Sequence, residues 1–287
     1  RNQIFKLSLG WRYVGILHEY ADATKKDNPG FVKIAGDYRV QARTEGARNV
    51  GIDAKEKYSR DAEVLEKALL DEPENARYQF YLAQSYFDSQ QWEKSLEAYK
   101  KRVEMGGWNE EIFYSQFRVG LISGIMKLPH EVIIKEMMEA YNIRPIRAEP
   151  LVEISRLYRM NDKPAAAFPF ARLAADLPYP EHDILFISED VYRFGALDEL
   201  GAVAYYAGRP EEGYHACKRL MEGSRVAPEH LERVQTNLQQ YEQVMAQAQV
   251  QKMQGDMQSQ VDKLKKRRDE KALQQKTTYK KKKAKSR

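Results

Sequence analysis

The chain has 287 residues, of which 43% are hydrophobic and 31% charged, and its mean hydropathy is −0.71. No stretch approaches the run of about 20 apolar residues that a membrane span needs, and the length allows one long domain or two modest ones with a buried core. The net charge of +5 belongs to one end, because residues 263–287 carry 13 basic and two acidic side chains and the first 262 residues carry 34 basic and 40 acidic.

Residues 1–50 predict short strands rather than helices. Apolar side chains concentrate in residues 4–9 and 11–17, and the two runs are separated at Gly10 and broken again at Gly15. A few strands in about 50 residues do not form a stable unit alone. We therefore expect this stretch either to pack on the rest of the chain or to be the end of a larger sheet. The first residue is Arg1 rather than Met, which fits a fragment or a processed product.

Residues 76–107 have the pattern of a tetratricopeptide repeat, a pair of antiparallel helices about 34 residues long. Leu82, Ala83 and Tyr86 fall on one face of a first helix, and Ser95 and Tyr99 fall on one face of a second. Small residues at the crossing let the two backbones approach each other. The same pattern predicts a helix over 61–73 before this pair.

Three further pairs are predicted after it. They cover residues 110–124 with 131–141, residues 148–176, and residues 197–221. Residues 179–194, which include the apolar run 184–187, interrupt the series as an insertion without the repeat pattern. Four or five repeats exceed the roughly three that bury a continuous core, so we predict a mostly α, tetratricopeptide-type α-solenoid.

The C-terminal end divides into two parts. Residues 228–260 are rich in Gln and place Leu231, Val234, Leu238 and Tyr241 at helical spacing, which predicts a helix that caps the last repeat. Apolar residues thin out beyond Lys263, and we expect a disordered basic tail there. The predicted organisation is an α/β segment and linker at 1–55, repeats at 56–225, a capping helix at 226–262 and the tail at 263–287.

Two groups of residues allow both a structural and a functional interpretation. The aromatic residues of the first complete repeat could form a carbohydrate-stacking groove, but their spacing favours a role in the core; they are Tyr78, Phe80, Tyr81, Tyr86 and Phe87. The lone Cys217 excludes an internal disulfide framework, fits a reducing, cytoplasmic compartment, and is expected in the core rather than as a nucleophile.

Several segments occur in an order that resembles one group of glycosyltransferases. They are the run Trp11–Tyr20 (WRYVGILHEY), the run Arg43–Asn49 (RTEGARN), the run Tyr58–Leu69 (YSRDAEVLEKAL), and the repeat segments YLAQSYFD, MGGWNEE, RAEPLVEISRLYR and PYPEHDILF. The chain from residue 1 to about 237 is similar to the C-terminal part of family 2 glycosyltransferases of the GT-A fold, in a bacterial and phage-associated group with a tetratricopeptide extension.

The resemblance implies a metal-dependent reaction. It assigns His18 as a ligand of a divalent metal, Mn²⁺ or Mg²⁺, beside the diphosphate of a nucleotide-sugar donor, with Glu19 orienting it. The chain contains no Asp-x-Asp pair and nothing similar to the nucleotide-binding half of such a domain. No catalytic residue is therefore assigned, and the chain by itself is expected to be inactive unless a catalytic half precedes it.

Two functions follow from these patterns. In the first, the chain is the C-terminal portion of an enzyme that transfers a sugar from a nucleotide-sugar to an acceptor hydroxyl, and its repeats bind a protein or glycan acceptor. In the second, the repeats are a non-catalytic scaffold for protein–protein interaction. The tail could then bind a polyanion, although the lack of a recognisable reading motif or regular aromatic interleaving favours a solvated tail. Its candidate residues are Lys265, Lys266, Arg267, Arg268, Lys280, Lys281, Lys282 and Lys283.

Overall fold

The computed structural model describes residues 7–23, 53–223, 226 and 228–285. Within these ranges the chain forms two compact units. Unit 1 comprises the described residues up to Leu157 together with Leu177–Glu189, and unit 2 comprises Tyr158–Asp176 and the residues from Asp190 onwards. The chain thus passes from one unit to the other three times.

Unit 1 begins with a small hairpin. A short 3-10 helix, η1 (Leu7–Leu9), precedes strands β1 (Trp11–Val14) and β2 (Tyr20–Ala23), which pair antiparallel with Trp11 opposite Ala23. Gly10 and Gly15 both have positive φ, as their position between apolar runs suggested. The prediction of strands is confirmed for β1, whereas Ile16 and Leu17 lie in the turn rather than in a strand.

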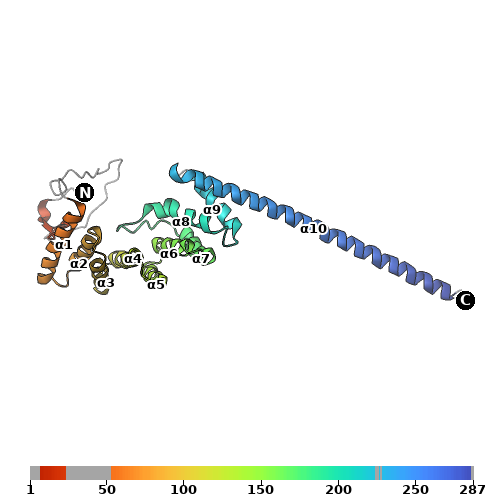
Figure 1. Ribbon diagram of the computed structural model, residues 1–287, viewed down its shortest axis with the longest axis horizontal. Coiled ribbons are helices and arrows are strands. Elements are labelled where there is room, and N and C mark those ends of the chain that lie inside the picture. The colour runs from red at the N-terminus through yellow and green to blue at the C-terminus, as the bar shows by residue number, and fades with distance from the viewer. Residues whose placement is uncertain (1–6, 24–52, 224–225, 227, 286–287) are drawn as a thin grey trace. The chain divides into compact units, whose positions relative to one another are not determined.

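The helices of unit 1 follow as antiparallel neighbours (Figure 1). They are α1 (Ala54–Asp71), α2 (Ala76–Asp88), α3 (Trp92–Glu104), α4 (Asn109–Ile125), α5 (His130–Ile143) and the larger part of α6 (Glu149–Met160). The side chains of Asp53 and Asn75 cap α1 and α2 by accepting hydrogen bonds from backbone N–H groups of the first turn.

The α2–α3 pair shows why small residues occur at its crossing. Ala83 and Ser95 are wholly buried, and the Ser95 hydroxyl donates to the Ala83 carbonyl at 2.9 Å. The Gln79 amide donates to the Ala98 carbonyl at 2.9 Å in the same interface. These bonds require the close backbone approach that larger side chains would prevent, and they confirm the repeat predicted over 76–107.

Unit 2 contains α7 (Pro164–Asp176), a π-helical turn η2 (Val191–Gly195), α8 (Ala196–Val203), α9 (Pro210–Glu222) and α10 (Pro228–Lys285). Residues 191–194, expected in an insertion, lead directly into α8. The helices expected over 148–176 both form, but α6 up to Leu157 belongs to unit 1 and α7 to unit 2. The buried Cys217 lies in the core of unit 2, as predicted.

Helix α10 begins as the predicted cap. Val234 and Tyr241 are almost fully buried against the core of unit 2. The Tyr241 hydroxyl accepts from the Tyr205 N–H at 2.8 Å and donates to the Gly201 carbonyl at 2.9 Å. A capping helix over the first half of this region is therefore correct.

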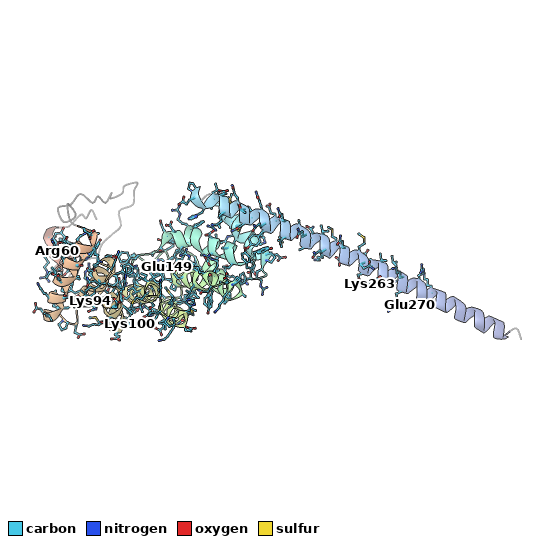
Figure 2. The ribbon with its side chains drawn as sticks, in the orientation of Figure 1. Arg60, Lys94, Lys100, Glu149, Lys263 and Glu270 are labelled. Carbon is cyan, nitrogen blue, oxygen red and sulfur yellow. The ribbon has the colours of Figure 1, made fainter. Side chains whose placement is uncertain are left out.

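The disorder predicted beyond Lys263 is not what the structure shows. Helix α10 continues to Lys285 and extends far beyond α8 and α9 (Figure 1). Figure 2 places Lys263 and Glu270 on this projecting part. Lys, Arg, Gln and Ala dominate the sequence after Gly255, and all four favour helix, so the lack of apolar side chains removes packing without removing helix propensity.

Among the described residues, no helix is both long enough and apolar enough to cross a membrane.

Candidate functional site

The candidate site lies on one face of α2 and α4 in unit 1. Polar and aromatic side chains recur every three or four residues along both helices, which places them in two adjacent rows. The rows, here called the α2/α4 face, consist of Arg77, Tyr81, Gln84 and Asp88 on α2 and of Glu110, Tyr114 and Arg118 on α4.

The N-terminal hairpin covers the start of the α2 row. The imidazole of His18 stacks on the Tyr81 ring with centroids 3.9 Å apart and planes 6° from parallel. Arg77 donates to the His18 carbonyl at 2.8 Å, and its guanidinium lies 4.8 Å from the centroid of the Tyr20 ring. The hairpin is thus held on the solenoid by stacking and by one arginine, which confirms that residues 1–50 include a segment packed on the repeats.

A non-helical piece of chain covers the start of the α4 row. We call residues Asp183–Ser188 the return segment, because they bring the chain back to unit 1 after α7. One carboxylate oxygen of Glu110 accepts from the backbone N–H groups of both Ile184 (2.7 Å) and Leu185 (2.8 Å). Further along, Glu149 accepts from the Ser188 N–H at 3.1 Å. Buried carboxylates therefore bind the main chain of the segment rather than its side chains.

The acidic side chain of the return segment is enclosed by arginines. The Asp183 carboxylate is wholly buried and pairs with both Arg144 and Arg147. Hydrogen bonds from Arg144 are the main reason that the pKa of Asp183 is lowered, and the same bonds raise the pKa of Arg144. Arg147 also donates to Glu149 at 2.7 Å and lies 4.5 Å from the centroid of the Phe113 ring. Figure 2 places Glu149 among the side chains of unit 1.

The aromatic side chain of the return segment lies over rings of the α2/α4 face. The Phe186 ring is 4.8 Å from the Tyr114 ring and 6.4 Å from the Phe80 ring, centroid to centroid. Its carbonyl accepts from Arg147 at 3.1 Å. Phe186 nevertheless remains 47% exposed, and its φ of 44° lies in the left-handed region.

The remaining part of the face carries polar groups with incomplete hydrogen bonding. The Arg118 guanidinium lies 3.8 Å from the Phe87 ring centroid and 5.1 Å from that of Tyr114. Within the described part of the chain, its Nε and the Gln84 Oε1 are buried atoms without a hydrogen-bond partner. Burial raises the pKa of Asp88, although the nearby Arg118 charge opposes the shift. A polar ligand here would satisfy groups that folding leaves unsatisfied.

The predicted core role of the aromatic residues holds for three of the five. Tyr78, Phe80 and Tyr86 are buried, whereas Tyr81 and Phe87 are only partly buried and pack against the core. The sequence did not indicate the roles of Glu110, Asp183 and Phe186. Their only signal was the non-repeat run 184–187 itself, an apolar stretch bounded by Asp183 and Ser188.

The sequence-predicted metal and polyanion residues do not come together in one site among the described residues. His18 is stacked on Tyr81, and both it and Glu19 are exposed. The described residues include no group of three or more His, Cys, Asp or Glu side chains that could hold a metal ion, so they do not fit a complete metal site. The roles given to His18 and Glu19 stay predictions. The basic residues at 265–268 are exposed on α10, and the side chains at 280–283 lie outside the described residues.

The chain matches no protein-family model, and no curated protein is similar to it in sequence. Among solved structures it resembles BtubC from P. vanneervenii, with a TM-score of 0.50, 11% identity, and coverage of 67% of this chain and 83% of that one.

MamA is similar with a TM-score of 0.45 and 15% identity, and the match covers 61% of this chain and 96% of that one. YrrB, described as a TPR protein with an unusual peptide-binding site, is similar with a TM-score of 0.43 and 12% identity, and the match covers 61% of this chain and 80% of that one. At these identities the likeness concerns the fold alone, and it gives no support to a GT-A domain. The fold is a tetratricopeptide-type α-solenoid, as the sequence predicted.

Proposed function

We propose that this protein is an interaction module whose α2/α4 face binds an extended segment of another polypeptide. One observation carries the proposal: the face already binds a non-helical segment of the same chain, through two main-chain N–H groups on Glu110, while Arg147 beside the face binds a main-chain carbonyl of that segment. Recognition of main-chain groups gives affinity for any extended peptide, and the pockets beside it select side chains.

The chemistry of the face suits such a ligand. Charged side chains make stronger hydrogen bonds to backbone groups than neutral ones do. The aromatic rings of Phe80 and Tyr114 offer a surface for an apolar side chain, and Gln84 and Arg118 have buried polar atoms that lack partners among the described residues. Main-chain capture, an aromatic surface and unsatisfied polar atoms therefore occur side by side on the same two helices.

The test is selection of displayed random 12-residue peptides on the full chain. Binding of the selected peptides should weaken about tenfold or more in Arg118→Ala, because a charged hydrogen bond contributes about 1.5–3 kcal/mol. Lys100→Ala is the matched control, since it removes an exposed cation from α3 (labelled in Figure 2) rather than from the face. The proposal fails if no peptide is selected, or if selected peptides bind both variants as they bind the unchanged chain.

The glycosyltransferase activity implied by the resemblance stays a prediction, as does the cytoplasmic location. The activity is tested by measuring turnover of nucleotide-sugars with Mn²⁺ or Mg²⁺ and comparing the unchanged chain with His18→Ala. A polyanion-binding role of the C-terminal end is favoured by the exposure of its basic residues along one projecting helix. Retention on immobilised heparin should fall steeply with salt, and removal of residues 265–287 should abolish it.

A further inference from the structure

The return segment is held along its length by main-chain hydrogen bonds, whereas two of its side chains are not enclosed. The Asp183 carboxylate is wholly buried between two arginines. Phe186, by contrast, is 47% exposed, and the intervening Ile184 is 71% exposed. The carboxylate therefore anchors the segment, and the ring covers the α2/α4 face without being enclosed by it.

The backbone at Phe186 adopts a conformation that its residue type disfavours. Phe186 has a φ of 44°, and left-handed backbone is strained for a residue with a bulky side chain. The hydrogen bond from Arg147 to its carbonyl and the ring contacts hold it there. A shift of the Phe186 backbone out of this conformation, together with the ring, would release the strain, which lowers the cost of exchanging the ring for another group.

The surface beneath the ring is built independently of the return segment. Phe80 is wholly buried, and its ring contacts Tyr81 at 5.4 Å, Tyr99 at 6.4 Å and Tyr114 at 5.9 Å, centroid to centroid. These contacts come from α2, α3 and α4 alone. An aromatic surface therefore remains in place when Phe186 leaves, ready to receive a second ring.

We propose that Phe186 is a built-in occupant of an aromatic subsite on Phe80 and Tyr114, and that a partner polypeptide inserts its own aromatic side chain there in place of Phe186. This inference rests on the proposed function. The partner is an extended segment with an exposed Phe, Tyr or Trp, and its polar groups on one side of that residue reach Gln84 and Arg118. Asp183 stays bound, so the chain keeps its occupant within reach and the two rings compete for one subsite.

Competition makes the affinity of the unchanged chain depend on how often Phe186 is away. A subsite that is open for a tenth of the time binds about tenfold more weakly than one that is always open. Removing the Phe186 ring should raise the affinity for the peptide by that factor, whereas removing the exposed Ile184 side chain should leave the affinity unchanged. Phe186→Ala and Ile184→Ala form the matched pair for this comparison.

The experiment titrates the full chain with the blocked peptide acetyl-Leu-Phe-Ile-Ser-amide, which copies residues 185–188, and follows binding by NMR. We expect Phe186→Ala to bind about tenfold more tightly than the unchanged chain, Phe186→Leu to fall between them, and Ile184→Ala to match the unchanged chain. A peptide with Ala in place of Phe should not bind. Tyr114→Ala added to Phe186→Ala should abolish binding, and circular dichroism confirms that each variant is folded.

Two results would overturn the inference. The first is equal affinity of the unchanged chain and Phe186→Ala, which would mean that the ring does not block the subsite. The second is no binding of the peptide to Phe186→Ala. If displayed peptides still bind through Arg118 in either case, the face is an interaction site and only the built-in occupant is wrong. If no displayed peptide is selected either, the proposed function itself fails.

Discussion

The two units bury different chemistry. The interior of unit 1 contains paired charges: Arg102 binds Glu111 at 2.8 Å, and Arg147 bridges Glu149 and Asp183. Among the described residues of unit 2, Glu199 is the one acidic or basic side chain in the buried class, and it pairs with Arg159.

Close contact of small residues occurs in both units, as between Gly120 and Met137 in unit 1, but in unit 2 it is not accompanied by a network of buried charges among the described residues. The helices of unit 2 bring Gly201 against Cys217 and Gly213 against Tyr241. The comparison shows that the two parts of one solenoid can differ in whether buried ion pairs contribute to their stability in addition to close packing. Unit 1 should be sensitive to the loss of a charge and to pH, and unit 2 should be sensitive to added volume.

The largest effect is expected from Arg147→Ala. Removing one partner from a buried charge network leaves the others uncompensated, which costs about 3–5 kcal/mol of unfolding free energy. Arg156→Ala is the control, because its ion pair with Glu153 is exposed and such pairs contribute about 0–1 kcal/mol. The loss of unfolding free energy in each variant is measured by unfolding in guanidinium, with hydrogen exchange at the amides of unit 1 as the readout. Equal losses in the two variants would show that the network does not stabilise unit 1.

A smaller loss is expected from adding one methyl group to unit 2. In Gly213→Ala, the new Cβ would lie 2.2 Å from Cζ of the Tyr241 ring, so the ring must move, at about 1–3 kcal/mol. Gly124→Ala in α4 is the matched control: its Cβ would meet nothing within 4 Å, and it should gain about 0.5–1 kcal/mol from helix propensity.

The reactivity of the buried Cys217 thiol in unit 2 distinguishes Gly213→Ala from Gly124→Ala. Burial raises the pKa of Cys217 to about 11, so its thiol is protonated at pH 8 and reacts slowly with Ellman's reagent while the unit is closed. Labelling should accelerate in Gly213→Ala and not in Gly124→Ala. Unchanged labelling in both would mean that the helices around Gly213 accommodate the methyl group.

The pH dependence of unit 1 should be smaller still and confined to acid. The Asp183 carboxyl has a lowered pKa in the folded chain, mainly because Arg144 donates to it. Its contribution is fully present above the unfolded value of about 3.9 and is lost as the pH falls through the folded value. Asp183→Asn should therefore flatten the fall in stability below about pH 4. An unchanged acid limb in Asp183→Asn would contradict this assignment.

The smallest effect is expected from deletion of residues 265–287. Lys265 to Arg268 are exposed on the projecting part of α10 and bury nothing in unit 2. Surface changes of this kind alter stability by less than about 0.5 kcal/mol. A clear drop in the melting temperature of the shortened chain would show that this part of α10 contacts another element.

The sequence predicted what depends on local periodicity. Ala83, Ser95 and Tyr99 recur at repeat spacing, and the helices around them form where that spacing placed them. It could not predict the return segment, because a short non-helical stretch has no repeat spacing and Glu110 binds residues 74 and 75 positions later. It also underestimated α10, since charge density suggested disorder and helix propensity decided the outcome.

The return segment also fixes the order in which the newly made protein can be completed. Leu185, which donates to Glu110, follows it by 75 residues. At about 5–20 residues per second, a ribosome needs about 4–15 s to reach it after making Glu110. Until then the return segment cannot occupy the face for which we propose peptide binding. Other extended polypeptides can reach that face first, so unit 1 meets its competitors during its own synthesis.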